Sequence, residues 1–308
     1  MKFFTSALIS FMLWIGAHAA EAPSVVVTTY PLYEVMHRVG GDTIRLEQVI
    51  PHGRDIHTFR PSPKTMAAIS RASLFVYSGA GLEPWSEQLL TNLSSRTRAV
   101  EMSRFVQLLE HDDEEEGHGD EHEEEGHGGH HHGAVDPHYW LDITNMIAMT
   151  EAAERLLTEL QPGLRDLYRR NAETYSAELK ALEAEYRRAL ASCKQHYLVS
   201  NHDAFGYIAH AYGFETIAVT GLSPDQQPSA KTMAEVMKLI QTKKIRTVFF
   251  EAFVSDSVAR SLAHDTGAKA ASLQPLANLS GDEAASNENY ITIMRNNLEK
   301  IVQALECH

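Results

Sequence analysis

The stretch Leu164–Ser192, LRDLYRRNAETYSAELKALEAEYRRALAS, decides how this chain of 308 residues is organised. Apolar and aromatic residues recur in it at three- and four-residue spacing, while arginine and glutamate fill the other positions, and this pattern predicts an amphipathic helix. A helix of about 28 residues, rising about 1.5 Å per residue, would span about 42 Å and is longer than one small domain needs. We therefore expect it to join two lobes. Its apolar positions are Leu164, Leu167, Tyr168, Tyr175, Leu179 and Leu182.

Before this helix, β-branched runs alternate with helical patterns. The expected strands and helices lie at residues 25–29, 31–39, 44–50, 65–71, 74–77 and 143–160. The alternation restarts after the helix, with elements expected at residues 197–200, 204–212, 216–220, 230–242, 247–253 and 290–305. Strands that alternate with helices indicate parallel sheets. The predicted fold class is therefore α/β, with two βα lobes, residues 20–163 and 193–308, joined by one long rigid helix, residues 164–192.

The first 19 residues have the pattern of a secretory signal peptide. Lys2 precedes an apolar run at residues 3–15, and Ala17 and Ala19 form an A-x-A-like cleavage site. The run is too short for a transmembrane anchor, which needs about 18 or more apolar residues. We expect cleavage after Ala19 and an exported protein without a membrane span.

The chain contains two cysteines, Cys193 and Cys307. Because neither lies near the expected cleavage site, we expect no lipid attached there through a thioether. In an exported protein the two cysteines could form a disulfide, but the sequence does not show whether their Cα atoms come close enough to pair.

The formal charge of −14 is concentrated in one segment, since ten of the 41 acidic residues lie between Asp112 and Glu125 and the charge without them would be −4. We expect no nucleic-acid partner and no basic patch for an anionic membrane. Residues 111–132 hold seven histidines, ten carboxylates and five glycines and lack any apolar side chain, which predicts disorder. This segment is either a solvated insertion or a weak, multivalent collector of metal ions.

Three histidines lie at expected strand or loop ends, where α/β folds bind ligands. His57 ends PHGRDIH at residues 51–57, His138 lies in DPHYWLD at 136–142, and His202 follows the expected strand at 197–200. Neutral imidazole is the commonest protein ligand for zinc, and three imidazoles with a carboxylate or a water complete a tetrahedron. We predict a zinc site from these three. A single histidine is more often a surface or capping residue, and we assign that role to His37, His52, His196, His210 and His264.

The ordered motifs resemble the cluster A-I metal-binding proteins of ABC importers, and most closely their periplasmic zinc-binding components. Besides the histidine segments, the resemblance rests on Pro61-Ser62, on GAGLEPW at 79–85 and on HDAFGY at 202–207, and it covers essentially the whole mature chain. It implies one metal at the lobe interface, with His57 and His138 from the first lobe and His202 from the second. Manganese-selective members usually carry glutamate at the position of His202, so histidine favours zinc.

The resemblance also implies a fourth ligand before the last helix. Asp282 is the first candidate and Glu288 the second, while other relatives use water. Glu251, at the end of an expected strand, could instead orient a ligand histidine. The chain departs from the family pattern at Pro63-Lys64 and Ala72-Ser73, which lie outside this ligand set.

We predict a monomer that captures Zn²⁺ in the periplasm and delivers it to an ABC permease without chemical turnover. The alternative from another class is a secreted zinc hydrolase, because three ligands and an open position can activate water, with Glu251 or Asp282 as the base. An H-E-x-x-H helix, which would favour the hydrolase, is absent from the sequence. A metal buffer or adhesin-like surface protein is the third possibility.

Overall fold

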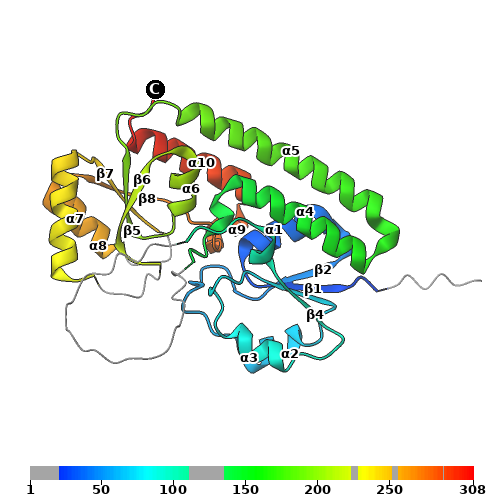
Figure 1. Ribbon diagram of the computed structural model, residues 1–308. Coiled ribbons are helices and arrows are strands. Elements are labelled where there is room, and N and C mark those ends of the chain that lie inside the picture. Colours follow the sequence, from blue (N-terminus) through cyan, green and yellow to red (C-terminus); the bar gives the residue numbers. More distant parts are fainter. Residues whose placement is uncertain (1–20, 111–134, 223–227, 252–255, 287) are drawn as a thin grey trace, which may run out of the picture.

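The computed structural model describes residues 21–110, 135–222, 228–251, 256–286 and 288–308. The predicted signal peptide and the acidic, histidine-rich segment at 111–132 therefore lie outside the described residues. Two four-stranded sheets, each parallel throughout, lie in two lobes that are covered by helices (Figure 1). The predicted α/β class with two parallel sheets is confirmed.

The first sheet has the order β2-β1-β3-β4. Its strands are β1 (Ser24–Val27), β2 (Arg45–Gln48), β3 (Leu74–Tyr77) and β4 (Arg98–Glu101). The central strands β1 and β3 are almost continuous runs of buried valine, leucine and phenylalanine, as expected for parallel strands with helices on both faces. β4 was not expected, because only the two middle residues of its sequence RAVE are apolar.

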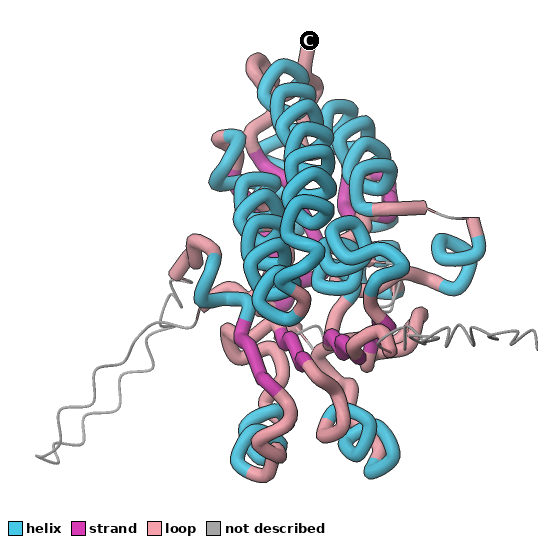
Figure 2. The backbone as a smooth tube through the Cα atoms, turned by 90° about the vertical axis from the view of Figure 1, so that its right-hand side faces the viewer, coloured by secondary structure: helices cyan, strands magenta, loops and turns pink. Residues whose placement is uncertain are grey.

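Helices of the first lobe lie on both sides of this sheet. α1 (Tyr30–Gly40) and α4 (Ile143–Leu160) cover one side, and the short helices α2 (Pro63–Ile69) and α3 (Ser86–Thr91) lie on the other (Figures 1 and 2). Asp142 caps α4, because its side chain accepts a hydrogen bond from the backbone N–H of Thr144 in the first turn. Short 3₁₀ turns occupy Gly41–Thr43, Met102–Phe105, Tyr139–Leu141 and Pro162–Leu164.

The second sheet repeats the topology of the first, with the order β6-β5-β7-β8. Its strands are β5 (Tyr197–His202), β6 (Glu215–Thr220), β7 (Thr247–Phe250) and β8 (Lys269–Ser272). In both sheets the first strand of the lobe lies between the second and the third. Ligands of such sheets bind beyond the carboxyl ends of the strands where the order reverses, which here is the boundary between β5 and β7.

Helices also cover both faces of the second sheet. α7 (Ala230–Lys243) and α8 (Ser257–Thr266) pack on one face, whereas α6 (Gly206–Tyr212) and α10 (Tyr290–Ala304) lie toward the first lobe (Figure 1). A single turn of helix, α9 (Gly281–Ala285), precedes α10. Among the described residues, no helix combines the length and the apolar character that crossing a bilayer requires.

The linking helix is present as α5 (Arg165–Ala189), which begins one residue later and ends three residues earlier than predicted. It runs along α4 and α1 of the first lobe and along α10 of the second (Figure 1). At about 1.5 Å per residue its 25 residues span about 38 Å. Leu164 and Leu167 are only half-buried. The fully buried positions follow a strict three- and four-residue spacing: Tyr168, Ala172, Tyr175, Leu179, Leu182 and Tyr186.

One hydrophobic core extends through both lobes. It contains strand residues of the first sheet such as Val25, all the buried residues of α5, and second-lobe residues such as Leu198, Leu276 and Ile301. A smaller, separate core lies beneath α7 and α8. Because a shared core must be broken to separate the lobes, we expect the lobes to move little as rigid bodies.

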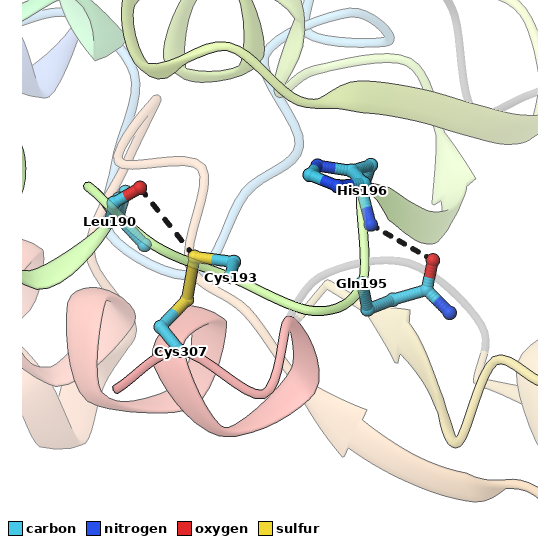
Figure 3. The surroundings of a disulfide bond; sticks show 5 residues. All are labelled: Leu190, Cys193, Gln195, His196 and Cys307. Carbon is cyan, nitrogen blue, oxygen red and sulfur yellow. Dashed lines mark hydrogen bonds between the residues drawn. A yellow bond between two sulfur atoms is a disulfide. The ribbon is translucent and has the colours of Figure 1, made fainter.

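A disulfide joins Cys193, just after α5, to Cys307, just after α10 (Figure 3). The sequence left this pairing open, and the structure shows that the two cysteines pair. Two backbone hydrogen bonds flank the bridge, from Gln195 N to Leu305 O at 3.0 Å and from His308 N to Ser192 O at 3.0 Å. The bond closes a loop with a sequence separation of 114 residues, which contains the whole second sheet.

The double substitution Cys193→Ser and Cys307→Ser should lower the free energy of unfolding by about 2–4 kcal/mol, because a covalent link across a long loop restricts the unfolded chain. Urea unfolding followed by circular dichroism measures the change. Wild-type protein unfolded under reducing conditions is the control and should match the double variant. Equal stability of the variant and the oxidised wild type would contradict this role.

Candidate metal centre

Three histidines from both lobes converge in one place. His57 lies in the loop after β2, His138 immediately precedes the turn that leads into α4, and His202 is the last residue of β5. Their ring centroids are 5.2 to 5.5 Å apart. Each histidine has one ring nitrogen that lies within 4.8 Å of a ring nitrogen of both other histidines. The structure therefore brings together the three histidines that the sequence selected.

The spacing of the ring nitrogens suits a tetrahedral metal ion. His138 Nε2 and His202 Nε2 are 3.4 Å apart. Two nitrogens bound to zinc at about 2.0–2.1 Å with a tetrahedral angle would be about 3.3–3.4 Å apart. His138 and His202 are almost completely buried, and His57 is partly buried. The three rings line a cavity of about 20 Å³, which has room for one water or one ion.

A buried carboxylate orients His138. Asp136 Oδ1 lies 2.8 Å from His138 Nδ1 and also accepts the backbone N–H of His138 at 2.9 Å. The Asp136 backbone is fixed in turn, since its N–H donates to Leu109 O at 3.1 Å and its carbonyl accepts from Tyr207 Oη at 2.9 Å. With Nδ1 donating to the carboxylate, the lone pair of Nε2 points to the cavity.

Gly206 lies against the same carboxylate. A Cβ atom at this position would lie 3.0 Å from Asp136 Oδ2, so a larger residue would push on the group that holds His138. This close approach gives a physical reason for the glycine in HDAFGY.

A second carboxylate orients His202. Glu251 directly follows β7, the neighbour of β5 in the sheet, and its Oε1 contacts His202 Nδ1 in an ion pair whose side chains are both almost fully buried. This is the position expected for a residue that orients a ligand histidine. Burial acts to lower the pKa of His202, but the charge of Glu251 and its contact with the ring raise that pKa above its ordinary value.

His57 has the opposite electrostatic character. Burial, together with the charges that His138 and His202 would carry when protonated, lowers the pKa of His57 to about 2. Its backbone N–H donates to Asp55 Oδ1 at 2.7 Å, which fixes the local turn. His57 therefore offers a neutral imidazole to the cavity over the whole physiological pH range.

The candidates for a fourth ligand lie in different places. Glu251 lines the cavity, but it contacts His202 Nδ1, whereas the nitrogen of His202 that approaches His138 is Nε2. Asp282 is exposed in the first turn of α9, and neither it nor Glu288 lines the cavity. In the described part of the chain, the group that could hold a metal consists of the three histidines. A ligand role for Asp282 would need its segment to move and stays a prediction.

Two residues near the site were not assigned a role from the sequence. Asp136 could have been found from its position two residues before His138, because that spacing allows one carboxylate oxygen to reach both the ring and the backbone of the histidine. Asn278, which lines the cavity next to Ala277, had no such signal. It lies 76 positions after His202, in a segment that the sequence leaves without a pattern.

A comparison with protein families identifies the architecture. A family model described as the periplasmic zinc-uptake complex component A, ZnuA, matches residues 25–304. The chain belongs to the ZnuA family. This confirms the resemblance to the zinc-binding components of importers that the motifs indicated. The ZnuA model describes an uptake component and not a known class of enzyme.

Individual relatives agree with membership of the ZnuA family. The zinc-binding lipoprotein AdcA of Streptococcus pneumoniae is 35% identical over 287 residues, which cover 92% of this chain and 56% of AdcA. The chain thus spans about half the length of that relative. A putative metal-binding protein of Treponema pallidum is 32% identical, with 93% of this chain and 88% of that protein covered. The crystal structure of the Zn(II)-bound ZnuA-like domain of S. pneumoniae AdcA superposes with a TM-score of 0.77 at 31% identity, covering 92% of this chain and 99% of that domain.

Nuclear magnetic resonance of the ¹⁵N-labelled imidazoles in metal-free protein should separate the histidines of the site. The ring of His57 should remain neutral from pH 8 to pH 5, whereas His202 should take up a proton above its ordinary pKa of about 6.5. Below about pH 6.5, His57 binds a proton in the unfolded chain but not in the folded protein. The contribution of His57 to the free energy of unfolding therefore falls as the pH is lowered. The urea-denatured chain, in which both rings should titrate near pH 6.5, is the control. A folded His57 that titrates at that value would contradict this assignment.

Proposed function

We propose that this ZnuA-family chain is a periplasmic substrate-binding protein that captures Zn²⁺ and delivers it to an ABC permease. His57, His138 and His202 would bind the ion between the lobes. The observation that carries the proposal is the convergence of three imidazole nitrogens on one buried cavity, with a nitrogen pair 3.4 Å apart. This is the edge length of a tetrahedral zinc site.

The chemistry of the donor set supports zinc over other divalent ions. Imidazole nitrogen suits zinc, whereas manganese and magnesium prefer oxygen ligands. The names of the relatives agree, since AdcA is called a zinc-binding lipoprotein and its ZnuA-like domain has been crystallised with Zn(II). The family description, an uptake complex component, supports transfer of the ion to a membrane complex.

We propose water as the fourth ligand. The carboxylates nearest the rings are already engaged: Asp136 with the ring of His138, Glu251 with the ring of His202, and Asp55 with the backbone N–H of His57. The two ring contacts raise the basicity of the ligand rings and fix their orientation. They also leave neither Asp136 nor Glu251 free to act as a general base toward a zinc-bound water, which favours capture and delivery over hydrolysis.

The acidic, histidine-rich segment at 111–132 would serve as a weak, multivalent collector. The residues that flank it support this role, because Glu110 and Val135 pair with each other and the chain then reaches His138 within three residues. Ions released from the segment would therefore be close to the site. Each transient capture costs ordering entropy, so we expect its affinity to be weaker than that of the preformed cavity.

The proposal also includes export by a cleaved signal peptide, a monomeric state and a division into lobes at residues 20–163 and 193–308. The disulfide supports an oxidising compartment, since such bonds persist mainly in exported proteins.

The substitution His138→Ala should remove the tight zinc site, because the remaining two nitrogens cannot hold a tetrahedral ion with comparable affinity. Isothermal titration and elemental analysis measure the stoichiometry. Deletion of residues 111–132 is the matched comparison and should keep one tight site while losing the weak ones. Tight binding of one Zn²⁺ by His138→Ala would overturn the proposed site.

Zinc affinity should fall as the pH falls from 8 to 5, by up to about tenfold per unit, because Zn²⁺ must displace a proton from His202 below its raised pKa. His57 adds no such competition, since its pKa is lowered to about 2. Titrations against a zinc chelator of known affinity give the dependence. In Glu251→Gln the fall should begin at a lower pH, because the carboxylate that raises the pKa of His202 is gone. Affinity that is unchanged between pH 7.5 and pH 5.5 would refute this competition.

A further inference from the structure

The segment between β8 and α9, residues 273–280, follows the second sheet but is bonded to the first lobe. Trp140 Nε1 donates to Pro275 O at 2.8 Å, and Tyr30 N, at the start of α1, donates to Ala277 O at 3.2 Å. Between them Leu276 is completely buried and has a φ of +59°, which a residue other than glycine keeps only where its surroundings fix it. The segment is therefore a rigid support at the lobe boundary.

Asn278 uses the full hydrogen-bonding capacity of its amide in this segment. Its Nδ2 donates to Pro51 O at 2.7 Å and to Arg54 O at 3.0 Å, while its Oδ1 accepts from Gln48 Nε2 at 3.0 Å and from Leu279 N at 2.9 Å. The residue is only 1% exposed and lines the same cavity as the three histidines. Three of its four bonds cross from the second lobe to the first.

Two of the bonded partners, Pro51 and Arg54, lie in the loop after β2 that carries His57. Gly53 N adds a further bond across the boundary, to Leu279 O at 2.8 Å. Residues 51–54 are exposed, so their carbonyls could bond to water if Asn278 were lost. Losing the amide should therefore release the loop at little cost to the fold. His138 and His202, by contrast, are each oriented by their own carboxylate and do not depend on this loop.

We propose that Asn278 is a positioning residue for metal capture, which holds the His57 loop of the first lobe at the distance from His138 and His202 that the ion requires. The inference rests on the proposed function and deepens it. Because Asn278 holds His57 in place before the ion arrives, ion binding does not have to order the His57 loop. The side-chain amide thus sets the affinity of the site without touching the ion.

Asn278→Ala should weaken zinc binding by about 10- to 100-fold, the range found when groups that support metal ligands are removed. In a His57→Ala background the same substitution should have almost no further effect, because Asn278 acts through His57. This double-mutant cycle, measured by titration of full-length protein against a zinc chelator, separates positioning from a general structural role. Without metal, the Gly53 amide should exchange with solvent faster in Asn278→Ala than in the wild type.

Asn297→Ala is the matched control. Asn297 is equally buried and bonds the same segment, with its amide accepting from Gln274 N at 3.1 Å and donating to Gln274 O at 2.7 Å, but these bonds do not reach the His57 loop. It should keep wild-type affinity and the wild-type exchange rate at Gly53. Asn278→Leu, which replaces the amide with an apolar group of similar size, is a second test variant in case the alanine leaves a void.

The outcomes distinguish this inference from the proposed function. If wild-type protein binds no Zn²⁺, the proposed function itself fails. If it binds Zn²⁺ and His57→Ala weakens binding, then equal affinities of the Asn278 and Asn297 variants, or additive effects in the cycle, would overturn the positioning role. Failure of both Asn278 variants to fold while Asn297→Ala folds would assign Asn278 to the fold and overturn it as well.

Discussion

Three imidazoles must meet in a buried cavity with their lone pairs facing one another, and much of the structure serves this requirement. Placing the ring centroids of His57, His138 and His202 within 5.5 Å of one another buries polar rings, which is unfavourable unless each ring is held and its outward nitrogen is satisfied. Asp136 and Glu251 satisfy two of those nitrogens. The same contacts fix the direction in which the rings can bind an ion.

The site lies between the lobes, so its geometry depends on how firmly the lobes are joined. A core shared by both sheets, the helix α5 along both lobes and the segment 273–280 all restrict their relative movement. Entry and release of an ion are then more easily achieved by a local change in a loop than by a wide hinge motion. Residues 51–54 of the loop that carries His57 are exposed, and the Asn278 amide bonds this part of the loop to the second lobe.

Much of the fold could be predicted from local patterns. The spacing of Tyr168, Tyr175 and Leu179 predicted the linking helix, and the β-branched runs predicted most of the strands, because both signals reflect burial of one face of a single element. Strands β4 and β8 were missed, since each has only two apolar residues and is stabilised by pairing with its neighbour, β3 or β7. Pairing of Cys193 with Cys307 depends on a contact across 114 residues and could not be decided locally.

The sequence by itself selected the three candidate ligands, because His57, His138 and His202 each stand in a distinctive segment at a strand or loop end, where parallel sheets bind ligands. Only the tertiary structure decided how these rings are held. The contact of Glu251 with His202 requires two strands to be adjacent, and the bonds of Asn278 to the His57 loop join residues more than 220 positions apart. Such contacts leave no periodic trace in the sequence, since they depend on where the folded chain brings single side chains together.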